Sequence, residues 1–117
     1  MMEITLQHED KLTVPFSLGI FENCTLHLEK AMLGWYGAIE YPEKISIRNE
    51  YPYIIPPGML HATEDETLLV FYPSGDMLGG YWDNDATAIL KVRIQTVDND
   101  TVRIVLDLDE RIRWVAD

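Results

Sequence analysis

Two segments near the end of the chain alternate apolar and polar residues with a period of two. In 90–96 and in 102–108, the apolar side chains take the even positions over most of each segment. A period of two is typical of a β-strand that buries one of its faces. Between them, the Asp-Asn-Asp sequence at 98–100 is a turn signal. The pattern therefore predicts a long antiparallel hairpin over 88–108.

The phase of this alternation sets the length of the connecting loop. Directly opposed residues of a hairpin point to the same face of the sheet, so an even position must lie opposite an even position. A two-residue loop would place Ile94 opposite Val105, whereas a three-residue loop places Ile94 opposite Ile104 and Lys91 opposite Asp107. We therefore expect a three-residue loop with one residue in the left-handed conformation, which Asn and Asp tolerate.

Proline and glycine interrupt the chain at short intervals up to Gly80, and neither occurs after it. Short segments between frequent breakers are typical of all-β domains. Further strands are expected at 3–7, 44–48, 53–55 and 68–72. We predict a single β-rich domain over 1–117, either a β-sandwich or a small barrel, with about eight strands.

Segment 24–33 is compatible with a helix or with a strand. As a helix, it would have Asn23 as its N-cap and Gly34 just after its end. As a strand, it would direct its leucines inward and place His27 and Glu29 together on the other face. The predicted fold class is therefore all-β, or β-rich with one short helix near 24–33.

The chain is strongly acidic: 20 Asp and Glu against 9 Lys and Arg give a formal net charge of −11. This balance argues against a nucleic-acid partner, because phosphate contacts need Lys and Arg. No run approaches the roughly 20 apolar residues of a membrane span, and the N-terminus lacks the features of a signal peptide. We expect a cytoplasmic protein without a membrane partner. Its one cysteine, Cys24, is more simply a buried thiol than a nucleophile.

Three histidines offer possible metal ligands. If 24–29 is a strand, His27 and Glu29 share a face, since residues i and i+2 do so in any strand. His61 follows the Pro-Pro-Gly turn at 56–58 and could enter the same cavity from a neighbouring strand. Two histidines and one carboxylate would form a facial triad for one divalent metal. The alternative is that the histidines are surface or hydrogen-bonded side chains.

The segment around this turn resembles the second motif of the cupins. That motif reads P-x-G-x-x-H, and Pro56, Gly58 and His61 match it. His27, Lys30-Ala31 and Gly34-Trp35 are similar in placement to residues of the small tellurite-resistance-type cupins. The resemblance covers at most 12–73, and it departs from the first cupin motif at Glu29, where a second histidine is usual. It implies a double-stranded β-helix, with His61 as a metal ligand and His27 as a weaker candidate.

The acidic balance suggests a second kind of function, the binding of a basic partner protein. Small acidic inhibitors of nucleases, such as immunity proteins and antitoxins, use charge complementarity to speed capture. Aromatic side chains dominate binding hot spots, so the expected loop around Tyr81 and Trp82 is the best candidate contact surface, with Asp83 and Asp85 beside it. A free edge at the C-terminal strand would also favour a homodimer.

Overall fold

The computed structural model describes residues 1–19, 21–41, 53–55, 57–71, 80–83, 90–109 and 113–116. Within these ranges every regular element is a strand, and no helix is long and apolar enough to cross a membrane. The strands are β1 (Met2–Gln7), β2 (Lys11–Leu18), β3 (Phe21–Lys30), β4 (Trp35–Tyr41), β5 (Tyr53–Ile55), β6 (Met59–Ala62), β7 (Glu66–Phe71), β8 (Gly80–Asp83), β9 (Leu90–Thr96), β10 (Thr101–Leu108) and β11 (Arg113–Ala116). The all-β prediction is confirmed, and the expected strand at 44–48 lies outside the described residues.

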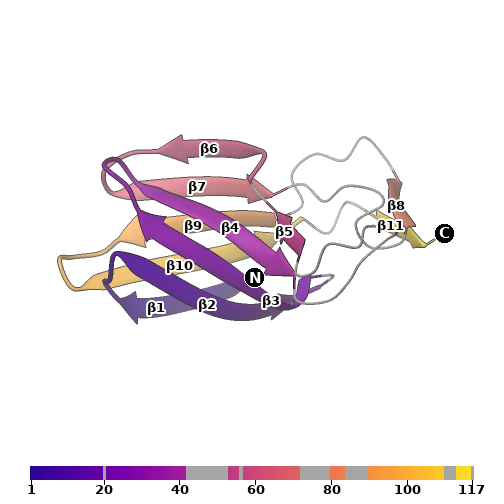
Figure 1. Ribbon diagram of the computed structural model, residues 1–117, viewed down its shortest axis with the longest axis horizontal. Coiled ribbons are helices and arrows are strands. Elements are labelled where there is room, and N and C mark those ends of the chain that lie inside the picture. The colour runs from indigo at the N-terminus through magenta and orange to yellow at the C-terminus, as the bar shows by residue number, and fades with distance from the viewer. Residues whose placement is uncertain are drawn as a thin grey trace.

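Two antiparallel sheets pack face to face (Figure 1). One has the order β1-β10-β9-β7-β6 and the other the order β2-β3-β4-β5. The β1–β2 connection carries the chain from the first sheet to the second, and β8 pairs with β11 in a separate two-stranded sheet. The architecture is that of a β-sandwich, with side chains of both main sheets forming one core.

The core is filled by the inward residues of these alternating strands. β9 and β10 contribute Leu90, Val92, Ile94, Val102, Ile104 and Leu106, each 0% exposed. The facing sheet contributes larger side chains, among them Trp35 at 2% and Phe21 at 1% exposure. Burial on this scale supplies most of the favourable free energy of folding, at roughly 25 cal/mol per Å² of apolar surface removed from water.

The C-terminal hairpin has the register that its sequence predicts. Ile94 lies opposite Ile104, and Lys91 lies opposite Asp107. The loop has three residues, 98–100, and is closed by a hydrogen bond from Val97 N–H to the Thr101 carbonyl. The expected left-handed residue in this loop is wrong: among the described non-glycine residues, only Asn23 has a positive φ. The Asp98 carboxylate instead accepts the Asp100 N–H at 2.8 Å and stabilises the turn.

Segment 24–33 is a strand over most of its length, so the helix alternative is wrong. β3 pairs with β2 on one side and with β4 on the other. Asn23 is not a helix cap. It lies in a bulge, where the register shifts between Phe16 and Leu18, and it adopts a φ of 55° while its N–H bonds to the Ser17 hydroxyl. Gly34 does not follow a helix; it has a positive φ, 81°, in the turn of the hairpin between β3 and β4.

Candidate functional site

His27 and Glu29 lie on the outward face of the four-stranded sheet. β3 buries Leu26 and Leu28, so the alternate residues are exposed. The prediction that a strand places His27 and Glu29 on one face is confirmed. His27 Nε2 lies 3.4 Å from Glu40 Oε1 on β4, and the two side chains are 46% and 35% exposed. A pair so open to solvent contributes about 0–1 kcal/mol at most.

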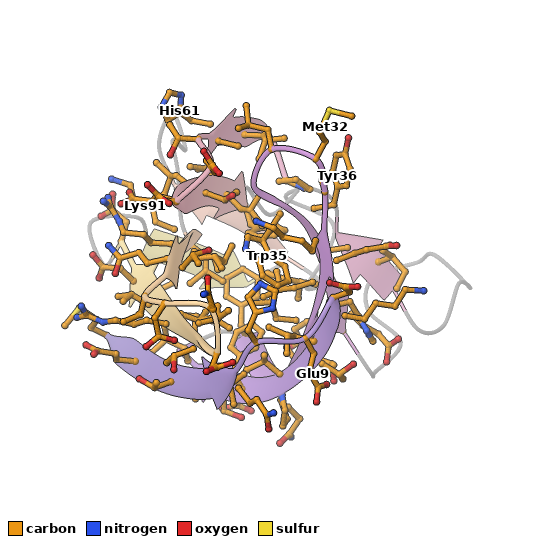
Figure 2. The ribbon with its side chains drawn as sticks, turned by 90° about the vertical axis from the view of Figure 1, so that its left-hand side faces the viewer. Glu9, Met32, Trp35, Tyr36, His61 and Lys91 are labelled. Carbon is orange, nitrogen blue, oxygen red and sulfur yellow. The ribbon has the colours of Figure 1, made fainter. Side chains whose placement is uncertain are left out.

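His61 lies on the other sheet and also faces outward. It is exposed on β6 and lies opposite Leu68 in the register with β7, while the next residue, Leu69, is in the core. Figure 2 shows His61 pointing away from the molecule. His61 therefore faces away from His27 and Glu29, with the whole sandwich core between them. The expected triad is not assembled, and no group of three His, Cys, Asp or Glu in the described part of the chain could hold a metal.

A shallow groove of about 400 Å³ crosses the outward face of β2, β3 and β4. It passes over Gly37 and Ala38, which carry little or no side chain, and Glu29 lies opposite both Lys11 and Tyr36 along it. Tyr36 is 63% exposed. The groove combines charges of both signs on an open sheet face, so it is a polar surface feature and not an enclosed site for catalysis.

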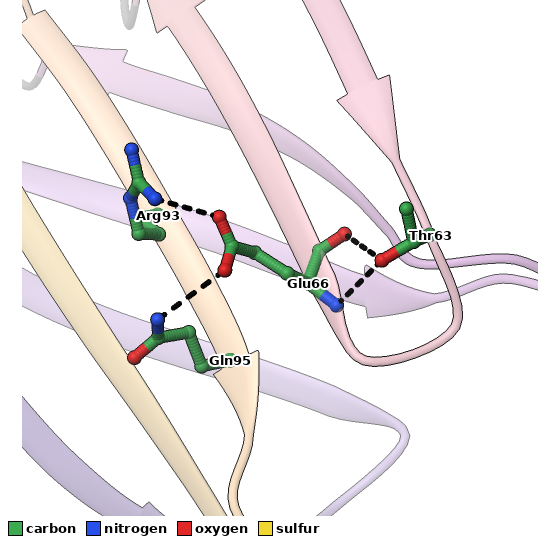
Figure 3. Close-up of polar contacts among 4 residues, drawn as sticks. All are labelled: Thr63, Glu66, Arg93 and Gln95. Carbon is green, nitrogen blue, oxygen red and sulfur yellow. Dashed lines mark hydrogen bonds and ion pairs between the residues drawn. The ribbon is translucent and has the colours of Figure 1, made fainter.

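Glu66 organises the outward face of the five-stranded sheet near its edge (Figure 3). Its carboxylate accepts hydrogen bonds from Arg93 Nη1 at 2.7 Å and from Gln95 Nε2 at 3.3 Å. Its backbone N–H donates to the Thr63 hydroxyl at 3.2 Å. These contacts join β7 to β9 and fix the turn that precedes β7. Because both carboxylate oxygens already have partners, this cluster has a structural role.

Cys24 is buried at 1% exposure on β3. Removal from water disfavours the thiolate and raises the pKa of the thiol from 9.0 to about 12. A thiol with this pKa is neutral at physiological pH and is a poor nucleophile.

We expect Ellman's reagent to modify Cys24 at least about 100-fold more slowly in the folded protein than in urea, because both burial and the raised pKa suppress the thiolate. Absorbance at the released chromophore measures the rate. Equal rates in the two conditions would contradict the burial of Cys24, and a Cys24→Ser variant gives the background signal.

The proposed aromatic contact surface is only partly described. Tyr81, Trp82 and Asp83 belong to β8 and pair with β11, so the expected loop is wrong at these positions. Trp82 lies opposite Trp114 in the register. Asp85 lies outside the described residues. A strand formed here because β11 supplies a pairing partner from 30 residues further along the chain, which no local pattern indicates.

Three hairpin loops and the β1–β2 connection meet at one end of the sandwich, at the left of Figure 1. Backbone hydrogen bonds hold them together: His8 N–H donates to the Asp100 carbonyl at 2.8 Å, and Thr96 N–H donates to the Asp65 carbonyl at 2.9 Å. We call these loops the loop end. It consists of residues 8–10, 31–34, 63–65 and 97–100.

The loop end carries six exposed carboxylates and neither Lys nor Arg. The carboxylates belong to Glu9, Asp10, Glu64, Asp65, Asp98 and Asp100. Three exposed apolar side chains lie in the same loops: Met32 at 102%, Leu33 at 56% and Val97 at 58% exposure. Figure 2 looks onto this end and shows Met32 projecting from it. Met32 and Leu33 are adjacent in one loop and Val97 lies in another; a protein-binding surface is marked by exposed apolar side chains that gather into a patch with a polar rim.

No protein family, curated protein or solved structure matches this chain. The resemblance to cupins therefore stays a prediction.

The sequence did not predict that these loops come together in the loop end, although several of its residues stand out in the sequence. The sequence shows acidic runs at 64–66 and 98–100, and Met32 and Leu33 lie in segment 24–33, which is compatible with a helix or with a strand. Their convergence depends on the strand order, which places residues 8 and 100 close together. The signal in the sequence that could have indicated the loop end is the presence of apolar residues close to acidic turns.

Proposed function

We propose that this protein is a binding module that captures a basic partner protein through the loop end, in the manner of an immunity-type or antitoxin-type inhibitor. One observation carries the proposal: four loops at one end present six carboxylates, no Lys or Arg, and the exposed apolar side chains of Met32, Leu33 and Val97. Proteins that bind through hairpin loops at one end of a rigid sandwich exploit the same arrangement.

Charge and apolar contact would contribute at different stages of binding. With a net charge of −11, the protein attracts a basic partner over distances of about a Debye length, roughly 8 Å at physiological salt. This attraction raises the association rate and orients the partner toward the acidic end. Once the surfaces touch, burial of the apolar side chains would slow dissociation.

Metal binding by His27, Glu29 and His61 receives less support. These side chains lie on the outward faces of two different sheets. A cupin-type metal needs ligands that point into the interior, and in the described residues apolar side chains occupy it. The carboxylates of the loop end are already exposed, so the partner-binding proposal requires no change of the fold.

The test compares two variants with the same net charge. The loop-end variant is Glu9→Gln, Glu64→Gln and Asp98→Asn, and the control variant is Glu22→Gln, Glu29→Gln and Asp107→Asn. Each raises the formal charge by three, from −11 to −8, at exposed positions. The probes are the basic proteins encoded beside this chain's gene, each purified alone and measured by surface plasmon resonance.

We expect one probe to bind, with an association rate that falls about tenfold or more between low and physiological salt. The loop-end variant should reduce this rate about three- to tenfold more than the control variant does, because local potential guides encounter. Equal losses in the two variants would show that net charge alone attracts the probe. Absence of binding by every probe at low salt would refute the proposal.

A further inference from the structure

Three of the four edges of the two main sheets are protected against pairing with another strand. β5 and β6 are short, with 3 and 4 residues. β2 contains Pro15 and begins with Lys11, and proline and lysine both discourage edge pairing. β1 has 6 residues and contains neither. The free edge expected at the C-terminal strand stays a prediction: β10 lies between β1 and β9, and β11 pairs on one side with β8, its partner among the described strands.

The backbone groups on the open side of β1 can be identified from the register. His8 lies opposite Asp100 and donates its N–H to that carbonyl, which extends the ladder of β1 with β10. Hydrogen bonding alternates along an antiparallel strand, so the even residues of β1 bond to β10. The N–H and C=O groups of Glu3, Thr5 and Gln7 therefore point away from β10, where no described strand pairs with them.

β1 also leaves the edge of the core incompletely covered. Its inward side chains, Met2, Ile4 and Leu6, are only partly buried and pack against the core cluster. Their partners on β10 are all 0% exposed, namely Leu106, Ile104 and Val102. A strand added beside β1, with apolar residues at alternate positions, would complete this burial.

We propose that β1 pairs antiparallel with β1 of a second copy of this chain, around a two-fold axis at Ile4. In this register Glu3 lies opposite Thr5 of the other copy, and Met2 lies opposite Leu6. The apolar residues meet on the inner face, and no two like charges are directly opposed. The outward-pointing backbone groups of Glu3 and Thr5 pair with each other across the axis, since opposed residues with free groups form the hydrogen-bonded pairs. The result is one continuous ten-stranded sheet.

The sequence of β1 is compatible with pairing to itself and limits the registers that this pairing can take. A shift that centres the axis on Glu3 places two Glu3 carboxylates directly opposite each other, which is destabilising. A shift by one residue places apolar side chains opposite polar ones on the wrong face. The ion pair of Arg103 Nε with Glu3 Oε1, at 2.8 Å, reduces the negative charge at this edge.

Salt separates this dimer from the proposed capture of a basic partner. Two copies of charge −11 repel each other, and added salt screens that repulsion. Dimerisation should therefore strengthen as salt rises, whereas capture of a basic protein at the loop end should weaken. The two proposals rest on different residues, so either can fail without the other.

The decisive variant is Thr5→Pro. Proline removes an N–H that points to the open side and leaves the bonds of β1 to β10 intact, as proline does at other strand edges. Sedimentation equilibrium of the full chain at several concentrations should show a dimer for the unchanged protein. The dissociation constant should rise about tenfold or more in Thr5→Pro, because the hydrogen bond of the Thr5 N–H is lost in both copies of the symmetric dimer. Thr5→Val, which keeps the N–H, should remain a dimer.

A second measurement does not depend on how the proline variant folds. Amide hydrogen exchange by NMR should show that the N–H groups of Glu3 and Thr5 become protected as protein concentration rises, while those of Met2 and Ile4 are protected throughout. A monomer at every concentration and salt, or exchange at Glu3 and Thr5 that is independent of concentration, would overturn the proposal.

Discussion

Ile104→Asp will leave the protein unfolded at room temperature. Ile104 is 0% exposed in the middle of β10, where it lies opposite Ile94 on β9 and Ile4 on β1. Truncation of such a side chain to alanine alone costs about 2–5 kcal/mol. Aspartate adds an unpaired carboxylate in an apolar interior, which costs several kcal/mol more or forces the group to become neutral. The sum is comparable to the whole stability of a typical domain, roughly 5–15 kcal/mol.

Far-UV circular dichroism and a urea titration measure this outcome. The matched control is Val97→Asp, which makes a similar chemical change at a side chain that is 58% exposed. It should alter the free energy of unfolding by about 0.5 kcal/mol or less. A cooperative urea transition for Ile104→Asp close to that of Val97→Asp would mean that Ile104 is not in the core, and the assigned register of the hairpin would be wrong.

The hairpin was predictable because its information is local and redundant. Alternation on both segments fixes which side chains are inward, and the same phase on both sides fixes the loop length. Ile94 opposite Ile104 follows from this alone. The conformation of the loop does not follow, since the Asp98 carboxylate accepts the Asp100 N–H and the turn forms without a left-handed residue.

The identity of β3 was not decidable from its own residues. Asn23 and Gly34 are placed as helix signals, and the leucines fit either period. The outcome depends on β2 and β4, which pair with β3 on both sides and supply hydrogen bonds that a helix would satisfy internally. In this segment, contacts that are distant in sequence override the local signals.

The predicted metal site is wrong, and the reason follows from the strand assignment on which the prediction was based. If β3 is a strand that buries its leucines, His27 and Glu29 must face solvent, whereas a metal inside a barrel needs them to face inward. The sequence does place them on one face, as expected, but that face is outward. His61 could not be placed relative to them, because its strand belongs to the other sheet.

Trp35→Ala will be strongly destabilising, at about 3–5 kcal/mol. Trp35 begins β4 directly behind the loop end and is 2% exposed. Its backbone N–H donates to the Thr67 hydroxyl at 2.8 Å, which links the two sheets. The Lys30 ammonium lies 5.4 Å from the centroid of the indole ring, and the His8 ring lies 5.6 Å away in an edge arrangement. The indole therefore contacts Lys30 at the end of β3 and His8 in the β1–β2 connection, as well as the core.

The turn before Trp35 depends on the same packing. Gly34 has a φ of 81°, and a Cβ at this position would collide with the Thr67 hydroxyl and the Ala62 side chain. The chain is thus closely packed where it turns into β4, and a cavity left by Trp35→Ala could not be filled by collapse of this loop. This raises the expected cost toward the upper end of its range.

Trp35→Phe is the matched comparison for Trp35→Ala, and we expect it to lower the free energy of unfolding by about 1–2 kcal/mol. The indole N–H is buried and has no hydrogen-bond partner among the described residues, and a buried donor without a partner costs about 1–3 kcal/mol. Phenylalanine removes that unpaired donor while it keeps much of the aromatic volume, so the two effects partly cancel. Urea titrations of the three proteins give the comparison. If Trp35→Phe destabilises as much as Trp35→Ala, the phenyl ring does not replace the packing of the indole, and the expected partial cancellation is wrong.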